Sequence, residues 1–341
     1  MNLDLASAAP PSTGTVRHRT PVSPLADQLT VVLLTFNCGH RIDRVLDELL
    51  RLGLAVIAVD NASSDDTVVR LAARPEIQVI ALDANVGAAG RNVGLEQART
   101  PYVVFCDDDG WWDGAGLAEA VRLFQHHPRL AVVNARILVR DEARLDPISV
   151  EMAASPLPDR SGVPGAVLLS FMAGAVIVRR SAYEEVGGYD PVFFLGGEEE
   201  TLALKLARRG WEMRYVPGVV MRHHPSVANA PRLRAFGMRN TLWNAWLHRR
   251  LGSAVRWTVF TLADTPKNED WLRGVRMALG GAGWVLRARR PIDRELDDAL
   301  TVLDRRRFAA RRRILNRIDP IKHRSPSTPV PPAQPADALT G

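Results

Sequence analysis

The sequence predicts an α/β protein with a doubly wound, mostly parallel sheet, helices on both faces of that sheet and a helical C-terminal extension. Two observations lead to this fold class. Runs of apolar residues alternate with segments whose apolar residues recur at helical spacing. The runs are apolar at successive positions rather than at every second one, which is typical of parallel strands that are buried on both faces.

The first two pairs of strand and helix have clear ends. LTVVLLTF at 29–36 is a continuous apolar strand, and the helical pattern after it ends at a glycine. A second strand covers 54–60, and the next helix, which Ser63 or Ser64 can cap, stops before Pro75. Glycine and proline end these helices because neither residue continues a helix well.

The later elements continue the alternation and then change character. A third strand at 77–83 precedes a helix over about 87–99, and YVVFC at 102–106 is the fourth strand. After Arg222 the sequence is rich in Arg, Trp, Leu and Ala at helical spacing, whereas both ends of the chain are rich in Pro, Ser and Thr. We therefore expect a disordered tail at 1–28, an α/β domain at 29–225, a helical extension at 226–317 and a second disordered tail at 318–341.

Composition indicates a globular protein, because 46% of the 341 residues are apolar and 24% are charged. The best candidate for a membrane span, Ala166–Val178, has 13 residues, whereas crossing a bilayer takes roughly 18. The N-terminus has no apolar run of signal-peptide length, and two cysteines form no disulfide framework. We therefore expect a cytoplasmic protein.

The basic charge is concentrated near the C-terminus. Arg305 to Arg324 contains nine Lys or Arg and one Asp, a net charge of +8, so the rest of the chain carries −2 of the total of +6. Such a run is ordinarily a solvated helix. Its functional alternative is peripheral contact with the anionic inner face of the cell membrane, carried by Arg305–Arg313 and helped by exposed tryptophans of the extension. We expect no nucleic acid as a partner, since the body of the chain is near neutral.

Polar side chains cluster where the expected strands end. Thr35 and Asn37 follow the first strand, Asp60 ends the second, and Asn85 follows the third. The carboxyl ends of parallel strands meet at one edge of the sheet, where such sheets bind ligands. We therefore expect these four side chains to contact a nucleotide, with Asp60 accepting a hydrogen bond from its ribose or base.

Three consecutive carboxylates, Asp107, Asp108 and Asp109, follow the fourth strand. Adjacent anions repel one another, so this triplet needs a cation. Alternate side chains of an extended backbone share a face, so Asp107 and Asp109 should point to the same side. Two convergent carboxylates suit Mg²⁺ or Mn²⁺ bound together with a phosphorylated ligand. The alternative is an acidic turn that caps a helix starting near Asp113.

The segment NVGAAGRNVG at 85–94 combines two kinds of residue. Gly90 and Gly94 lie four residues apart on a helix, which lets the backbone approach the sheet closely. Arg91 and Asn92 lie in the first turn of that helix, where the positive end of the helix dipole favours an anion. The spacing is not GxGxxG, so the segment does not predict a Rossmann dinucleotide site.

Three glutamates at 198–200 open a helix directly after the glycine pair at 196–197. Acidic residues in a first turn complement the helix dipole, so a structural role explains these glutamates as well as a catalytic one does. The glycine pair suggests a backbone that a ligand approaches. His223 and His224 follow a later apolar strand, and we consider His224 a candidate metal ligand.

Five ordered segments resemble those of the bacterial family 2 glycosyltransferases, which have the GT-A fold. The resemblance covers about residues 29–225, and its segments are TVVLLTFN, AVDNASSDDT, NVGAAGRNVG, FCDDD and VGGYDPVFFLGGEEE, the last followed by RRGW. It implies a nucleotide-diphosphate-sugar donor, UDP-, GDP- or dTDP-linked, together with a divalent metal at a DxD-type motif. It also implies inversion at the anomeric carbon of the transferred sugar.

The resemblance assigns roles to particular residues. Asp60 contacts the nucleotide, Asp107 and Asp109 face the metal and the diphosphate, and Arg91 with Asn92 lies on the donor side. Asp108 is expected beside the donor as the middle member of the triplet.

The family usually has Glu-Asp-x-Asp where this chain has Glu198 to Thr201. Glu199 therefore takes the position of the catalytic base with one extra methylene, and Thr201 replaces the second aspartate. RNTLW at 239–243 is similar to the C-terminal part of rhamnosyltransferase-like members.

These motifs together favour a metal-dependent inverting glycosyltransferase that moves a sugar to an acceptor hydroxyl. The acceptor would belong to a cell-envelope glycan, a glycolipid or a secondary metabolite, and a lipid-linked acceptor is one candidate. Two alternatives come from other classes. The first is a nucleotide-sugar-binding protein that has lost catalysis, which the departure at Glu198–Thr201 motivates. The second is a sugar-phosphate nucleotidyltransferase, for which the segment LTFNCGHR is a poor match.

Overall fold

The computed structural model of the chain describes residues 23–225 and 230–318. The side chains at 230–233 and 307–318 lie outside this description. The expected tails at 1–28 and 318–341 fall almost entirely on residues that are not described.

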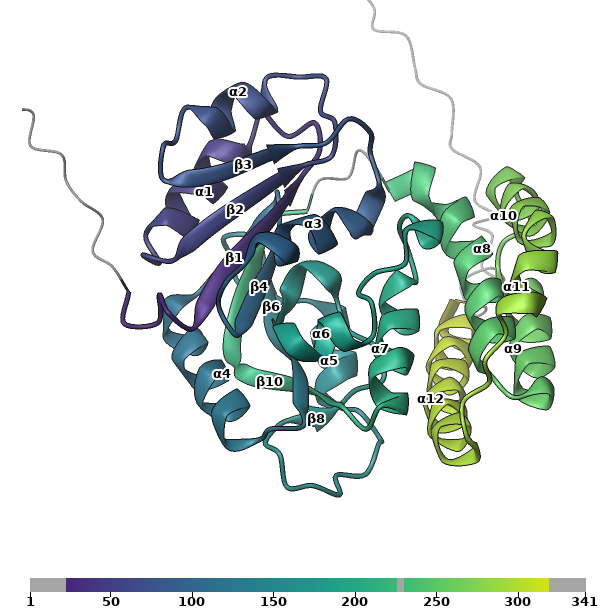
Figure 1. The fold of residues 1–341 in the computed structure, drawn as a ribbon. Coiled ribbons are helices and arrows are strands. Elements are labelled where there is room, and N and C mark those ends of the chain that lie inside the picture. The colour runs from purple at the N-terminus through teal and green to yellow at the C-terminus, as the bar shows by residue number, and fades with distance from the viewer. Residues whose placement is uncertain (1–22, 226–229, 319–341) are drawn as a thin grey trace, which may run out of the picture.

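A sheet of ten strands forms the centre of the molecule (Figure 1). Eight strands lie side by side in the order β3 (Ile77–Ala81), β2 (Ala55–Asp60), β1 (Leu29–Thr35), β4 (Tyr102–Asp107), β9 (Val176–Arg179), β6 (Leu130–Val139), β10 (Glu212–His223) and β5 (Gly110–Trp112). In addition, β7 (Arg144–Leu145) pairs with β6, and β8 (Ala166–Val167) pairs with β10.

The direction of the strands divides the sheet. β3, β2, β1 and β4 are parallel, and β10 is parallel to β6. β9 runs antiparallel between β4 and β6. The predicted α/β class with a mostly parallel sheet is thereby confirmed, and the apolar run that contains β9 is divided among β8, a short 3₁₀ turn and β9 itself.

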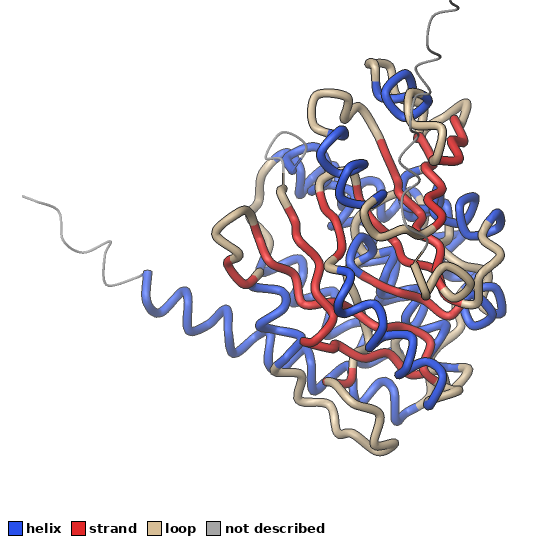
Figure 2. The backbone as a smooth tube through the Cα atoms, turned by 90° about the vertical axis from the view of Figure 1, so that its left-hand side faces the viewer, coloured by secondary structure: helices blue, strands red, loops and turns tan. Residues whose placement is uncertain are grey.

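The sheet is buried on both faces because successive side chains of its central strands point to opposite sides. On β1, Val31 and Leu33 enter one hydrophobic core and Val32 enters the other. Figure 2 shows helices on either side of the strands. The first core is covered by α1 (Ile42–Leu50), α2 (Thr67–Ala72) and α4 (Gly114–His126), and the second by α3 (Gly90–Gln97), α5 (Pro147–Ala153), α6 (Arg180–Glu185) and α7 (Glu198–Arg208).

The predicted helical extension is present and consists of α8 (Ala230–His248), α9 (Leu251–Asp264), α10 (Glu269–Gly280), α11 (Ala282–Ala288) and α12 (Arg294–Ile318). These helices lie together on the side of the molecule next to α7 (Figure 1). Their own core includes Leu242, Trp243 and Val285, and Phe193 of the α/β part joins it. Leu300 of α12 enters the second core of the sheet. The extension is therefore packed on the α/β part at two places.

None of the described helices combines the length and the apolar character that a membrane span needs.

The glycines of α4 provide a test of how closely this helix packs on the sheet. A Cβ added at Gly116 would lie 2.7 Å from Cα of Val219 and 2.8 Å from the carbonyl oxygen of Gly218, and both of these are backbone atoms of β10. A Cβ added at Gly114 would meet only a side-chain carbon of Leu52, at 3.4 Å. α4 must therefore move if Gly116 gains a side chain.

We expect Gly116→Ala to lower the free energy of unfolding by about 1–3 kcal/mol, the usual range for overpacking. Gly114→Ala, on the same helix, is the matched control and should leave the urea midpoint nearly unchanged. Equal midpoints for the two variants would contradict the close approach of α4 to β10.

Candidate active site

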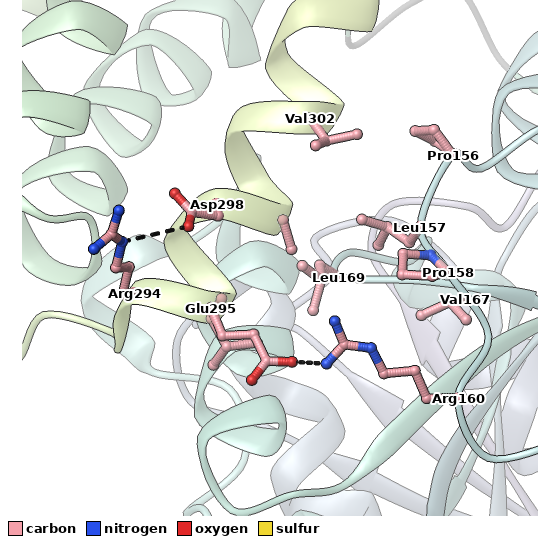
Figure 3. Close-up of a pocket in the computed structure, with 12 residues that line it drawn as sticks. Pro156, Leu157, Pro158, Arg160, Val167, Leu169, Arg294, Glu295, Asp298 and Val302 are labelled. Atoms are coloured by element: carbon pink, nitrogen blue, oxygen red, sulfur yellow. Dashed lines mark hydrogen bonds and ion pairs between the residues drawn. The ribbon is translucent and has the colours of Figure 1, made fainter.

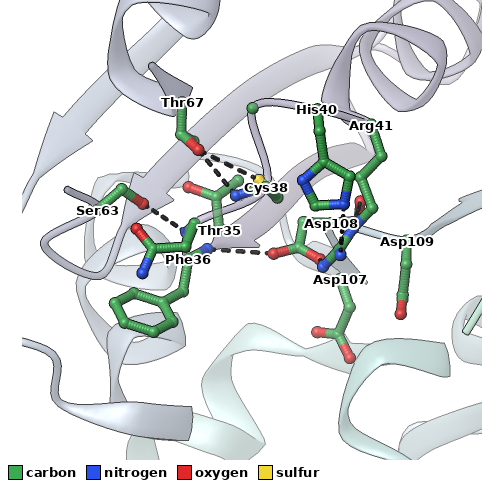
Figure 4. A network of polar contacts seen from close by, with 12 residues as sticks. Thr35, Phe36, Cys38, His40, Arg41, Ser63, Thr67, Asp107, Asp108 and Asp109 are labelled. Atoms are coloured by element: carbon green, nitrogen blue, oxygen red, sulfur yellow. Dashed lines mark hydrogen bonds and ion pairs between the residues drawn. The ribbon is translucent and has the colours of Figure 1, made fainter. Parts of the chain in front are cut away.

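The carboxyl ends of β1, β2 and β4 bring three polar side chains to one edge of the sheet. Thr35 at the end of β1 is in register with Asp60 on β2, and the neighbouring Leu34 is in register with Asp107 on β4. This placement follows from the parallel pairing of the three strands, since parallel strands end at the same edge. Figure 4 shows the side chains of Thr35 and Asp107 to Asp109 grouped at this edge.

Asp60 is fully buried and its carboxylate accepts three hydrogen bonds. Its Oδ1 accepts from the hydroxyls of Thr35 (2.9 Å) and Ser63 (2.6 Å), and its Oδ2 accepts from the amide of Ser63 (2.8 Å). Ser63 therefore closes the turn after β2 and does not cap the next helix, which begins at Thr67. The carboxylate fixes the shape of the edge on which a ligand would lie.

The three asparagines near this edge also hold loops. Oδ1 of Asn37 accepts from the amide of Ser64 (2.8 Å), and Oδ1 of Asn85 accepts from the amide of Gly87 (2.9 Å). Asn61, which the sequence did not single out, donates to the carbonyl of Gly87 (3.0 Å). β2 is thus tied to the loop that leads into α3.

The carboxylate triplet divides between two directions (Figure 4). Asp107 and Asp109 turn to one side, as the alternation along a strand predicts, and Asp108 turns toward the loop after β1. There Asp108 forms an ion pair with Arg41 and accepts from the amide of Phe36 (3.1 Å). Burial raises the pKa of Asp108, and Arg41 opposes that rise. Asp108 therefore holds the 36–41 loop, whereas Asp107 and Asp109 are the members that face away from it.

Arg91 is the cation that pairs with Asp107. Its side chain is 3% exposed and forms an ion pair with Asp107, whose side chain is 42% exposed. Burial disfavours the charge of Arg91, but the carboxylates of Asp107, Glu198 and Glu199 outweigh this effect and raise the pKa of the guanidinium. Nε and Nη1 of Arg91 have no hydrogen-bond partner among the described residues. Arg91 is therefore a fixed positive charge between two groups of acids.

Asn92 points away from Arg91. Its amide donates to the carbonyl of Tyr189 (2.8 Å), and its Oδ1 accepts from the hydroxyl of Tyr183 (2.5 Å) and the amide of Tyr189 (3.0 Å). The side chain therefore holds the segment after α6. Gly90 and Gly94 on the same helix have the packing role expected of them, since a Cβ on Gly94 would lie 2.4 Å from Cγ1 of Val32.

The three glutamates of α7 have three different environments. Glu198 is 3% exposed, and its Oε2 has no hydrogen-bond partner among the described residues. Glu199 accepts from the amides of Gly197 (3.3 Å) and Ala173. Glu200 faces the extension and pairs with Arg249 at 3.5 Å. Of the three glutamates, Glu198 and Glu199 are therefore the two whose carboxyl groups lie near Arg91.

Burial raises the pKa of both Glu198 and Glu199. The neighbouring charge of Glu199 adds to this effect and brings the pKa of Glu198 to about 8. Two buried carboxyls that repel each other hold a proton at neutral pH. A carboxyl with a raised pKa is suited to accept a proton from a hydroxyl group.

Helix α8 fixes the loop that precedes these glutamates. The buried amide of Asn240 donates to the carbonyls of Phe193 (2.9 Å), Leu195 (3.1 Å) and Gly196 (2.7 Å). Asn244, one turn later, donates to the carbonyl of Gly197 (2.7 Å) and accepts from the hydroxyl of Thr201. Thr201, which replaces a family aspartate, is thus part of this contact.

The glycine pair also has a structural role. Gly196 and Gly197 have positive φ angles of 86° and 98°, and a Cβ at Gly197 would lie 3.3 Å from Cβ of Asn240, so the pair permits both the turn into α7 and the approach of α8. The sequence did not identify Asn240 and Asn244 as site residues. Their four-residue spacing on the buried face of RNTLWNAW is the signal that could have identified them.

Of the two histidines at the end of β10, His223 is the one beside the triplet. Its Nε2 lies 3.4 Å from Oδ1 of Asp109. His224, our candidate ligand, instead stacks on Trp111 with ring centroids 4.7 Å apart, and its Nε2 lies 3.7 Å from Asp141. Trp111 and Trp112 are both buried in the first core.

A divalent cation fits these residues only if a ligand completes its coordination. The described residues contain no group of three or more His, Cys, Asp and Glu side chains placed to hold a metal ion. Asp107 and Asp109 nevertheless offer carboxylate oxygens on the same side, with His223 adjacent. Mg²⁺ characteristically takes one or two protein carboxylates together with phosphate oxygens and waters. The donor set therefore suits a cation that arrives with a diphosphate.

Solved structures with the same architecture identify the fold of this protein. Mannosyltransferase PcManGT from Pyrobaculum calidifontis, in complex with GDP-Man and Mn²⁺, matches with a TM-score of 0.52 and 20% identity over 75% of each chain. S. aureus TarS 1–349, in complex with UDP-GlcNAc, matches with a TM-score of 0.55 and 14% identity over 77% of this chain and 82% of that one. At these identities the likeness shows the fold alone, and that fold is the GT-A fold.

The sequence comparison identifies the domain that carries the site. Residues 30–187 match the family model described as Glycosyl transferase family 2, so this part of the chain is similar to the family 2 glycosyltransferases, in agreement with the resemblance. The chain is 31% identical over 227 residues to the pre-mycofactocin glycosyltransferase of Mycobacterium tuberculosis, covering 61% of this chain and 45% of that protein.

A second relative in Mycobacterium tuberculosis is N-acetylglucosaminyl-diphospho-decaprenol L-rhamnosyltransferase. It is 25% identical to this chain over 242 residues, covering 59% of this chain and 77% of that protein. The chain therefore spans about half the length of the first relative and about three quarters of the second.

The raised pKa of Glu198 predicts how stability depends on pH. The native state favours the protonated carboxyl, so stability is complete below the pKa of the unfolded chain, about 4.3, and is lost as pH rises toward about 8. We expect the wild-type free energy of unfolding to fall by a few kcal/mol between about pH 5 and pH 9.

Glu198→Gln should reduce this fall, measured by urea unfolding at both pH values. Glu76→Gln, at an exposed position, is the control and should leave the fall unchanged. The same pH dependence in all three proteins would show that Glu198 ionises in the ordinary carboxyl range.

Proposed function

We propose that this chain is a metal-dependent, inverting glycosyltransferase that transfers a sugar from a nucleotide-diphosphate-sugar to a hydroxyl of an acceptor. The observation that carries the proposal is that two carboxylates, those of Glu199 and Asp107, contact adjacent residues of one short segment. The amide of Ala173 donates to Glu199, and the next residue, Gly174, lies against Asp107. A base and a diphosphate-binding carboxylate are thus neighbours, as transfer between two bound substrates requires.

Glu199 is the proposed general base. In its ionised form it accepts the proton of the acceptor hydroxyl while the oxygen attacks the anomeric carbon and the bond to the nucleotide diphosphate breaks. The amides of Gly197 and Ala173 orient its carboxylate. Inversion follows because the oxygen attacks from the side opposite the leaving diphosphate.

Asp107, Asp109 and His223 are the residues proposed to hold Mg²⁺ or Mn²⁺. When bound, the cation offsets negative charge that develops on the departing diphosphate. The buried guanidinium of Arg91 contributes a second positive charge. Because it pairs with Asp107, it also keeps that carboxylate turned toward the donor. Thr35, Asn37, Asp60 and Asn85 shape the loops on which the nucleotide would lie.

The substrates are proposed from likeness and chemistry. Solved neighbours hold GDP-Man and UDP-GlcNAc, so the donor is proposed as a UDP-, GDP- or dTDP-linked sugar. The name of the rhamnosyltransferase relative includes a diphospho-decaprenol, which supports a lipid-linked acceptor. A protein that binds the donor and has lost catalysis remains the alternative, because Thr201 is engaged with Asn244 where the family has an aspartate.

A comparison of two variants tests this proposal. Glu199→Gln should lower the rate of transfer about 10²–10⁴-fold, the usual effect of losing a general base, and should preserve donor affinity. Asp109→Ala should abolish the metal-dependent thermal shift with UDP-GlcNAc, GDP-mannose or dTDP-rhamnose, because the cation loses an anchoring oxygen. Glu200→Gln, which faces the extension, is the matched control for the glutamate.

Three results would overturn the assignment. Unchanged activity of Glu199→Gln together with loss in Glu198→Gln would move the base by one residue. If Asp109→Ala still binds the donor in a metal-dependent way, the metal is not held by the carboxylate triplet. Donor binding by the wild type without transfer or hydrolysis across an acceptor panel would favour the inactive binding protein.

We also propose a cytoplasmic location with peripheral contact to an anionic membrane. The basic side chains after Arg306 lie outside the described ones, but α9 of the same extension exposes apolar side chains. On α9, Leu251, Val255 and Val259 are 63%, 45% and 62% exposed and lie on one face of the helix. The tryptophans of the extension are buried or half-buried rather than exposed, so the apolar part of the contact is assigned to these aliphatic residues.

The full chain should sediment with phosphatidylglycerol vesicles at low ionic strength, and most of this binding should be lost at about 1 M salt, where the Debye length is about 3 Å. Replacing Leu251, Val255 and Val259 by serine should weaken the residual, salt-resistant part of the binding. Truncation within α12 is unsuitable as a test, because Asp304 forms a buried ion pair with Arg249. Failure to bind at low salt would make the basic segment a solvated helix.

A further inference from the structure

A cavity beside the proposed base adjoins an apolar groove along α12. The inner cavity has a volume of about 190 Å³ and includes Glu199 in its lining. The outer groove has a volume of about 600 Å³ and runs between α12 and the segment 156–169 (Figure 3). Pro156 and Leu169 line both spaces, so the two spaces are neighbours.

We propose that this groove binds the hydrocarbon chain of a lipid acceptor whose hydroxyl-bearing head group occupies the inner cavity beside Glu199. The inference rests on the proposed function, because it takes Glu199 as the base. It adds the place where the acceptor binds and the apolar nature of the part of the acceptor that lies far from the reacting hydroxyl.

The walls of the inner cavity suit the junction between a polar head group and a chain. Glu199 lies in one part of the lining, and Met152, Phe171 and Leu303 provide apolar surface. Arg306 of α12 is also in the lining, and no ion pair joins it to another described residue. A guanidinium beside an apolar wall suits a phosphate or diphosphate that links a head group to a lipid.

The outer groove offers a hydrocarbon chain an apolar surface. Leu157, Val167, Leu169, Leu296 and Val302 line it. Its charged side chains form exposed ion pairs, Arg160 with Glu295 and Arg294 with Asp298, as Figure 3 shows. These charged side chains are solvated, so a chain lying on the aliphatic residues need not displace their water. An apolar chain gains from burial here, about fourfold in affinity per methylene.

The binding of alkyl phosphates tests the proposal without any transfer reaction. We expect decyl phosphate, below its micelle concentration, to bind the full chain at least tenfold more tightly than hexyl phosphate, and inorganic phosphate to bind most weakly, measured by calorimetry. Val302→Asp, at a position 40% exposed in the groove, should weaken decyl phosphate binding about tenfold or more. Val69→Asp, 71% exposed on α2 and outside both spaces, is the matched control and should bind like the wild type.

The donor provides a separate readout. Val302→Asp should retain the metal-dependent thermal shift with a nucleotide sugar. If the wild type shows no such shift, the proposed function is refuted, whereas the result on alkyl phosphate binding still stands. Equal binding of decyl and hexyl phosphate, or equal effects of Val302→Asp and Val69→Asp, would overturn the lipid groove. Tighter binding of an apolar peptide in competition with decyl phosphate would overturn the lipid as its occupant.

Discussion

The ion pair between Arg91 and Asp107 is the contact on which the rest of the site depends. Arg91 is buried under the carboxyl end of β4 and faces Asp107 on one side and the glutamates of α7 on the other. Without its charge, three carboxyls would approach one another in a region of low dielectric constant. Arg91 is the buried member of this pair, because its side chain is 3% exposed whereas that of Asp107 is 42% exposed. The arginine therefore stabilises the approach of the strand end that carries Asp107 to the helix start that carries Glu198 and Glu199.

The helical extension completes this arrangement rather than standing beside it. Asn240 and Asn244 bind the carbonyls of the loop that leads into α7, and Arg249 joins Glu200 to Asp304 of α12. Backbone carbonyls in an irregular loop need partners when water is excluded. α8 supplies them, so the position of Glu199 depends on residues more than forty positions later in the chain. α12 in turn forms one wall of the proposed acceptor groove.

The two sides of the site differ in chemistry. On the proposed donor side, carboxylates and loops held by hydrogen bonds surround the buried guanidinium of Arg91. This environment suits a charged diphosphate and its metal. On the side of Glu199 that faces α12, apolar side chains line most of the space together with Glu151 and Arg306, and the charged residues of the outer groove form exposed ion pairs. Glu199 lies where these two environments meet. Such a boundary fits an enzyme that joins a water-soluble donor to an amphiphilic acceptor.

The sequence by itself determined the α/β class, the parallel strands and the edge at which Asp60 and Asp107 lie, because these depend on alternation along the chain and on the ends of neighbouring strands. It also placed Glu199 at the start of a helix and Gly94 against the sheet. Only the tertiary structure decided that Asp107 pairs with Arg91, that His223 rather than His224 faces Asp109, and that Asn240 holds the 193–197 loop. Each of these is a contact between side chains and segments brought together by packing. Periodicity along one element cannot specify such contacts, since they depend on how whole elements are oriented against one another.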